Sequence, residues 1–297
     1  MIFRAPSLER YCAENSQNDM SSTAQVEKIK ILHKVNFVSQ GKGAPVVMIH
    51  GLAASLHDWD FLLPRLAEAG YAGYALDLLG HGDSPKPDVR GYQVEWLFDH
   101  FLFWLESLDF KQPPVLIGHS LGGYIALEFA RRFPDQTRGL ILVDPVYSMD
   151  QFPLFMRFTY NRPVLSDLIV HKTPEWLLRT IIDLSSQSVG HGAGGLYALP
   201  EEILEQTILD YTHTAPGLYN ILNNQLDLTS YISSIKTPSL VVWGDHDRTL
   251  APTSFSKLVT ALPTAIGRSI RAGRVPHQSN LKWFNSLVLE FLASLCR

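Results

Sequence analysis

Short apolar runs alternate with helical segments along most of this chain, and that alternation restricts its fold strongly. Residues 46–49, 71–78 and 114–117 are typical of strands buried in a parallel sheet. Each is followed by a segment in which apolar residues recur every three or four positions, as they do in a helix packed on a sheet. The same pattern returns between residues 239 and 295. We therefore predict a doubly wound, mostly parallel α/β fold.

Residues 146–235 interrupt this alternation. They show no strand pattern and are too numerous for an ordinary loop. Helical segments are expected at 165–170, 175–184, 201–213 and 218–226, separated by proline and glycine. We predict a helical cap of residues 146–235 inserted into a core formed by residues 26–145 and 236–297. Residues 1–25 are expected to form a loosely ordered extension.

Composition excludes several functional classes. The 297 residues include 25 Lys plus Arg and 29 Asp plus Glu, so the chain lacks the basic excess that nucleic acid binding requires. Neither an export signal nor an apolar run long enough for a membrane span is evident, and we expect a cytoplasmic protein. Cys12 and Cys296 are expected to be free thiols, although a bond between them remains open. The sequence leaves open whether the protein is a monomer or a homodimer.

Gly118-His119-Ser120-Leu121-Gly122 lies between a predicted strand and a predicted helix. The pattern G-x-S-x-G in this context predicts a nucleophile elbow, in which a tight turn lifts the serine hydroxyl above the sheet. Such a turn leaves no room for side chains at Gly118 and Gly122. The helix N-terminus beside Ser120 would favour negative charge that develops there. We therefore predict that Ser120 is a nucleophile.

A serine nucleophile needs a base, and the base needs an acid that orients it. In folds of this type the acid and then the histidine follow the serine along the chain. His277 lies between the last predicted strand and the terminal helix, and we predict that it is the base. Asp247 is the favoured acid, with Asp144 and Asp245 as alternatives at the ends of predicted strands.

Acyl transfer also requires donors for an oxyanion. We predict the backbone N–H groups of Leu121, directly after the nucleophile, and of Leu52, after an early strand. Gly51 would allow the backbone to approach the reacting centre. Asp77 and the segment 80–84 are better explained as a structural strand end and a tight turn.

The sequence resembles the α/β-hydrolase superfamily over residues 29–146 and 237–297. The resemblance rests on His50-Gly51 with Trp59 downstream, the segment 77–84, the elbow at Ser120, the segment from Gly244 to Asp247 with Pro252, and His277. It implies an eight-stranded core, a helical cap after the sixth strand, and no cofactor or metal. It also favours Asp247, which stands three residues after Gly244. One departure is Pro276, where the family usually has glycine.

These residues predict a carboxylesterase-type serine hydrolase that acts through an acyl-enzyme. The cap is rich in large apolar side chains, which suggests a small-molecule ester with an apolar acyl or alcohol group. These apolar cap residues are Phe152, Leu154, Phe155, Met156, Phe158, Tyr160, Trp176, Leu177 and Leu178.

Other functions on the same scaffold remain open. A serine-dependent C–C bond hydrolase, a lactonase, an acylglycerol lipase or a perhydrolase would use the same residues, and a ligand receptor with very slow turnover could retain them. Haloalkane dehalogenases and most epoxide hydrolases need a carboxylate nucleophile, so Ser120 argues against both.

Overall fold

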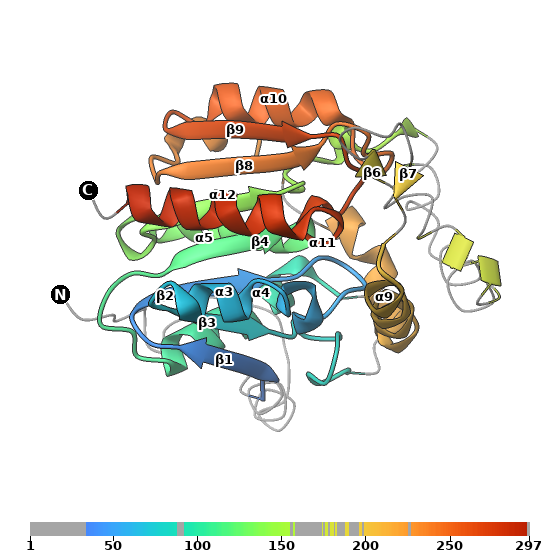
Figure 1. Ribbon diagram of the computed structural model, residues 1–297, viewed down its shortest axis with the longest axis horizontal. Coiled ribbons are helices and arrows are strands. Elements are labelled where there is room, and N and C mark those ends of the chain that lie inside the picture. Colours follow the sequence, from blue (N-terminus) through green and yellow to red (C-terminus); the bar gives the residue numbers. More distant parts are fainter. Residues whose placement is uncertain are drawn as a thin grey trace, which may run out of the picture.

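The computed structural model describes residues 34–87, 92–154, 199–224 and 227–295, with separate residues between 157 and 197. Its main sheet has the order β1-β3-β2-β4-β5-β8-β9, and only β1 is antiparallel to its neighbour (Figure 1). The strands are β1 (Phe37–Gly41), β2 (Ala44–Ile49), β3 (Tyr71–Leu76), β4 (Val115–His119), β5 (Gly139–Val143), β8 (Ser239–Gly244) and β9 (Ala265–Ile270). This confirms the doubly wound α/β fold. The described part holds seven of the eight implied strands, and residues 1–33 lie outside it.

Helices cover both faces of the sheet because the side chains of each strand alternate between its faces. Val46 and Met48 pack with α3 (Leu63–Glu68) and α12 (Leu281–Ser294), which lie in front of the sheet in Figure 1. The opposite face carries α4 (Val94–Ser107), α5 (Leu121–Arg132) and α10 (Pro252–Ala261). Among the described residues, no helix is both long and apolar enough to cross a bilayer.

The segment between β5 and β8 differs in part from the prediction. Helix α9 (Glu201–His213) matches a predicted helix, whereas the one predicted at 218–226 is a 3-10 helix, η4 (Pro216–Asn224). An unpredicted antiparallel pair, β6 (Ser188–Val189) and β7 (Leu196–Tyr197), also occurs here. Most of the other predicted cap helices, at 165–170 and 175–184, lie outside the described residues.

The carboxyl ends of the parallel strands meet at one edge, where α9, β6 and β7 also lie (Figure 1). Ser120 follows β4 at this edge, Asp144 follows β5, and Asp247 comes soon after β8. Arg274 lies between β9 and the one-turn helix α11 (Pro276–Ser279), which carries His277. In open α/β sheets, ligands bind at this edge. The fold therefore gathers the predicted site residues from distant parts of the chain.

Candidate active site

Ser120 occupies a strained turn between β4 and α5. Its φ of 53° and ψ of −112° lie in a region that residues other than glycine rarely adopt. Two backbone hydrogen bonds hold this conformation: Ser120 N donates to Val143 O at 2.9 Å, and Val146 N donates to Ser120 O at 3.0 Å. The backbone at Ser120 has the form expected of a nucleophile elbow.

The glycines on either side of Ser120 leave space for this turn. A Cβ at Gly118 would lie 2.3 Å from Gly122 O, and one at Gly122 would lie 2.2 Å from Ile49 O. Both contacts are with backbone atoms, which cannot rotate away. The pattern G-x-S-x-G is thus a steric requirement of the strand–turn–helix connection.

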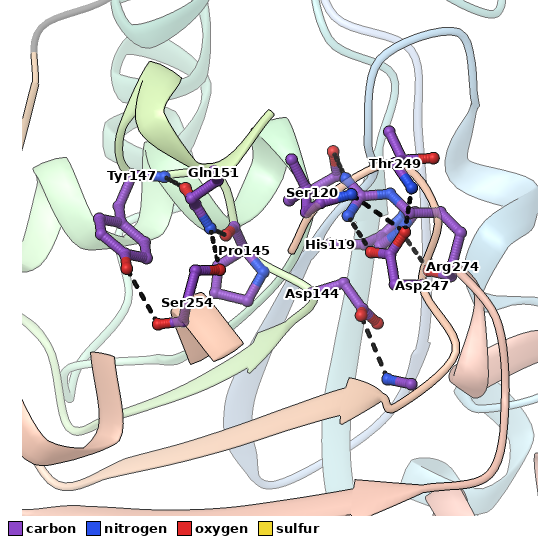
Figure 2. Close-up of polar contacts among 12 residues, drawn as sticks. His119, Ser120, Asp144, Pro145, Tyr147, Gln151, Asp247, Thr249, Ser254 and Arg274 are labelled. Atoms are coloured by element: carbon purple, nitrogen blue, oxygen red, sulfur yellow. Dashed lines mark hydrogen bonds and ion pairs between the residues drawn. The ribbon is translucent and has the colours of Figure 1, made fainter. Parts of the chain in front are cut away.

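Arg274 joins Ser120 to Asp247. One guanidinium nitrogen donates a hydrogen bond to Ser120 Oγ, and the other donates to Asp247 Oδ2 at 2.8 Å (Figure 2). The Asp247 side chain is fully buried, and Thr249 N and Leu250 N donate to its other oxygen at 2.7 and 3.1 Å. The serine and the favoured acid therefore share a site, with an arginine between them.

The alternative acids occupy different surroundings. Asp144 is completely buried beneath this site, and its Oδ1 accepts a hydrogen bond from Gly244 N at 3.2 Å (Figure 2). Burial, together with the nearby charge of Asp247, raises the pKa of Asp144 well above its usual value. Asp245 is partly exposed and contacts His246. Neither residue contacts Ser120 through a hydrogen bond in the described part of the chain.

His277 lies beside His119, the residue before the nucleophile, and within the described structure it makes no hydrogen bond to Ser120 or Asp247. Its ring centroid is 4.5 Å from that of His119 and 5.1 Å from that of Trp59. Its Nε2 lies 3.8 Å from Asp58 Oδ2, and within the described structure neither ring nitrogen has a hydrogen-bond partner. The three predicted triad residues thus come to one edge of the sheet without forming a hydrogen-bonded relay.

Pro276 explains the local path of this segment. It occupies the first turn of α11, where its fixed φ favours helix and its missing N–H costs nothing. The one-turn helix begins directly after Val275 and presents His277 toward Phe284 and Trp59. The departure from the family's usual glycine therefore coincides with an unpredicted helical turn.

Asp58, His119 and His277 form a second buried cluster. His119 Nδ1 lies 3.4 Å from Asp58 Oδ2, and its Nε2 donates to Arg274 O at 3.3 Å. Burial lowers the pKa of His119 to about 4. Burial alone would raise the pKa of Asp58, but the facing imidazoles of His119 and His277 outweigh it, so that pKa is lowered.

The predicted oxyanion donors, the backbone N–H groups of Leu52 and Leu121, belong to segments close to Ser120. Leu121 begins α5, and Leu52 follows Gly51 at the end of β2. Among the described residues neither amide N–H donates a hydrogen bond. A Cβ at Gly51 would lie 3.1 Å from Ser120 Cβ, so the backbone passes close to the serine.

A model of the α/β-hydrolase fold matches residues 44–270, which is most of the chain. The chain belongs to the α/β-hydrolase fold family. Rat bifunctional epoxide hydrolase 2 is 32% identical over 126 residues, covering 42% of this chain and 22% of that protein. Lipase 1 of Psychrobacter immobilis is 24% identical over 236 residues, covering 75% of this chain and 68% of the lipase.

Solved structures share the architecture. An esterase from Thermogutta terrifontis superposes with a TM-score of 0.74 and 21% identity, covering 88% of this chain and 93% of that chain. A putative aryl esterase from Burkholderia cenocepacia gives a TM-score of 0.73 at 21% identity, with 88% and 95% covered. This chain matches only about a fifth of the epoxide hydrolase, so that protein's activity does not transfer to it.

Asp77 has a structural role in this α/β hydrolase. One carboxylate oxygen accepts a hydrogen bond from Leu56 N at 2.7 Å, and the other accepts from Asn36 Nδ2 and Asp83 N, each at 2.8 Å. A Cβ at Gly82 would lie 2.1 Å from the Asp77 carboxylate, which explains the glycine in this turn. Asp77 thus ties together three segments outside the site, as the sequence suggested.

Sequence reasoning about this α/β hydrolase missed three residues at the site. Arg274 stands three residues before His277, and no motif marks it as a partner of Ser120. His119 occupies the variable second position of the elbow pattern, and Asp58, which directly precedes Trp59, belongs to no motif. Their positions in the sequence did not indicate that they belong to the site, because these residues meet only through packing at the sheet edge.

Proposed function

We propose that the protein is a serine hydrolase that cleaves carboxylic esters with an apolar acyl or alcohol group. The observation that carries this proposal is Ser120, held at positive φ at the end of β4; among the described residues, the nearby Leu52 and Leu121 amides donate no hydrogen bond. A hydroxyl in that setting suits attack on a carbonyl, since the amides of Leu52 and Leu121 can stabilise the resulting oxyanion.

The proposed reaction proceeds through an acyl-enzyme. Ser120 attacks the ester carbonyl while His277 takes its proton, and the Leu52 and Leu121 amides each contribute ~3–4 kcal/mol to stabilising the transition state. Asp247 orients the imidazole and stabilises its charged form. The alcohol leaves after protonation by His277, and water then releases the acid.

This reaction requires Arg274 and His277 to exchange positions. The guanidinium now contacts Ser120 and Asp247, the two groups that the imidazole must contact during catalysis. His277 follows Arg274 by three residues and already lies against His119, so a local change within residues 271–280 would bring it to Ser120. We propose that the observed arrangement is the resting state of the enzyme.

The apolar substrate class is supported by the segment after β5. Leu154 is 81% exposed and Trp176 is 68% exposed, whereas Phe152 is buried in the core. Four of the other apolar residues predicted there, Phe155, Met156, Phe158 and Tyr160, lie outside the described residues, as does Leu178. The lipase and esterase relatives agree with an ester substrate.

A slow-turnover ligand receptor is the second candidate. Arg274 holds the serine hydroxyl, and the imidazole has no contact with it, which would favour a protein that rarely turns over. Lactonase, C–C hydrolase and perhydrolase activities would use the same groups and differ in substrate.

Hydrolysis of p-nitrophenyl acetate, butyrate and octanoate would test the proposal, together with fluorophosphonate labelling and mass spectrometry of the modified peptide. We expect many turnovers per protein, labelling at Ser120, and loss of both in Ser120→Ala. Ser286→Ala, on the exposed face of α12, is the control. Undetectable hydrolysis, or hydrolysis that survives in Ser120→Ala, contradicts the proposal, and a single burst with a stable adduct supports the receptor.

A further inference from the structure

We propose that Asp58, His119 and His277 bind a divalent transition-metal ion, such as Zn²⁺, between their side chains. The proposal goes beyond the hydrolase function, and no motif in the sequence indicates a metal site. Two imidazoles and one carboxylate form a ligand set that Zn²⁺ readily accepts. One ligand atom from each residue lies within 4.8 Å of the other two.

The separations suit metal coordination better than hydrogen bonding. Asp58 Oδ2 lies 3.4 Å from His119 Nδ1 and 3.8 Å from His277 Nε2. Hydrogen bonds between such atoms span about 2.7–3.2 Å. Ligand atoms around a tetrahedral Zn²⁺ lie about 3.3–3.5 Å apart, given metal–ligand bonds of about 2.0–2.2 Å. The ligand atoms of the three residues lie within 4.8 Å of one another, so His277 would move toward the other two ligands when an ion binds.

The hydrogen bond of His119 places a lone pair toward Asp58. A backbone carbonyl only accepts, so His119 Nε2 must carry the hydrogen that it donates to Arg274 O. In neutral His119 the Nδ1 lone pair then faces the carboxylate oxygen of Asp58, an acceptor opposite an acceptor. A cation between the two atoms converts this repulsion into two favourable contacts.

Burial makes these atoms costly to leave without a partner. The side chains of His277, Asp58 and His119 are 1%, 7% and 8% exposed. Asp58 Oδ2, His119 Nδ1 and both His277 nitrogens have no hydrogen-bond partner within the described residues. Unsatisfied buried polar atoms are rare because each costs about 1–3 kcal/mol. Four such atoms in one cluster indicate a site for an additional group.

The other polar atoms of His119 and Asp58 form hydrogen bonds of the kind that metal ligands usually make. Ligating histidines commonly donate their other N–H to a carbonyl, as His119 does to Arg274. Ligating carboxylates are commonly hydrogen-bonded too, and Gln278 Nε2 donates to Asp58 Oδ1 at 2.9 Å. Gln278 also lines a pocket of about 140 Å³ with His57, Asp60 and Asp210.

Metal binding would hold His277 away from Ser120. A coordinated nitrogen cannot accept a proton, and the ligand geometry fixes the ring against Asp58. This consequence rests on the proposed hydrolase function: there, the ion would lower ester hydrolysis, and a chelator would restore it.

The test measures binding directly on the full chain. Protein stripped with EDTA and dialysed would be titrated with Zn²⁺ against a chromogenic chelator. We expect one tight equivalent, and at least about a tenfold weaker affinity in Asp58→Asn and in His119→Gln. His246→Gln, which removes an exposed histidine that contacts Asp245, is the matched control and should retain the wild-type affinity. Absence of a tight equivalent, or unchanged affinity in both cluster variants, overturns the proposal.

A second measurement uses only the wild-type protein, so its result does not depend on whether the variants fold. Co²⁺ bound to the wild-type protein should give the intense visible absorption of a four-coordinate ion, whereas the weak spectrum of hydrated Co²⁺ would overturn the proposal. Both readouts are independent of ester hydrolysis. Metal binding without hydrolysis would contradict only the proposed function, and hydrolysis without metal binding would contradict only the metal site.

Discussion

The guanidinium of Arg274 donates a hydrogen bond to Oγ of Ser120, although the two residues are 154 positions apart. Arginine has no acceptor atom and keeps its proton at any ordinary pH, so it cannot activate the hydroxyl as a base would. The arrangement therefore holds the proposed nucleophile in place without making it more nucleophilic.

Replacing Arg274 with methionine should make Ser120 react faster with a fluorophosphonate. The substitution keeps an apolar side chain of similar length but removes the donor that occupies Oγ and Asp247, which leaves both free to contact His277. We expect labelling to be several-fold faster, measured as the rate of Ser120 modification by mass spectrometry. Arg268→Met, at an exposed position on β9, is the control. Slower or unchanged labelling in folded Arg274→Met would show that the arginine does not restrain the serine.

Asp247 and Asp144 should differ sharply when each is replaced by asparagine. Removing an acid that orients the catalytic imidazole lowers kcat by roughly 10⁴. We expect a loss of that order in Asp247→Asn, and a change of less than about tenfold in Asp144→Asn, because burial already raises the pKa of Asp144 and favours its uncharged form. Steady-state hydrolysis of a p-nitrophenyl ester decides between them, and the reverse ranking would assign the acid to Asp144.

Gly122→Ala should destabilise the fold strongly. The added Cβ would lie 2.2 Å from Ile49 O and 2.6 Å from His50 O, so β2 and α5 would have to separate. We expect the free energy of unfolding to fall by more than about 3 kcal/mol, measured by urea denaturation.

Gly70→Ala is the matched control for that substitution. Gly70 has a φ of 82°, but no atom lies within 4 Å of the added Cβ. Backbone strain alone should therefore cost about 1–2 kcal/mol. Equal losses at the two positions would mean that the contact with β2 costs no more than the backbone strain at Gly70, and would contradict the prediction.

Asp210 should make the stability of the protein depend on pH. Burial raises its pKa from 3.8 to about 6, although Ser55 and Gln206 donate hydrogen bonds to it. The folded state therefore favours the protonated carboxyl. The contribution of Asp210 to the free energy of unfolding is fully present below pH 3.8 and is lost as the pH rises through about 6.

Asp210→Asn removes that dependence. Relative to the wild type, we expect the variant's free energy of unfolding to increase by on the order of 3 kcal/mol between pH 4 and pH 7. Chemical denaturation at several pH values measures it. Glu202→Gln, at an exposed position on the same helix, is the control. An identical pH profile in the two variants would contradict the prediction.

The alternation of strands and helices and the form of the elbow were predictable because both follow from local patterns. Apolar runs of strand length, such as residues 46–49, must be covered on both faces, and only a parallel sheet with flanking helices does this. Gly118 and Gly122 indicated the turn at Ser120 because their missing side chains match its steric requirement. Local spacing was less informative in the segment between β5 and β8, where the strand pair β6–β7 was missed. Strands of only two residues carry too few side chains to show a period.

Chain order alone places Ser120, Asp247 and His277 at the carboxyl edge of the sheet, because each follows a strand that ends there. Which of these side chains touch is evident only in the folded molecule. Arg274 contacts Ser120 and Asp247, while His277 lies beside Asp58 and His119. Contacts between side chains depend on loop paths and on competition among donors for the same acceptors. Both are settled by packing between segments more than a hundred residues apart, where no local period or motif carries information.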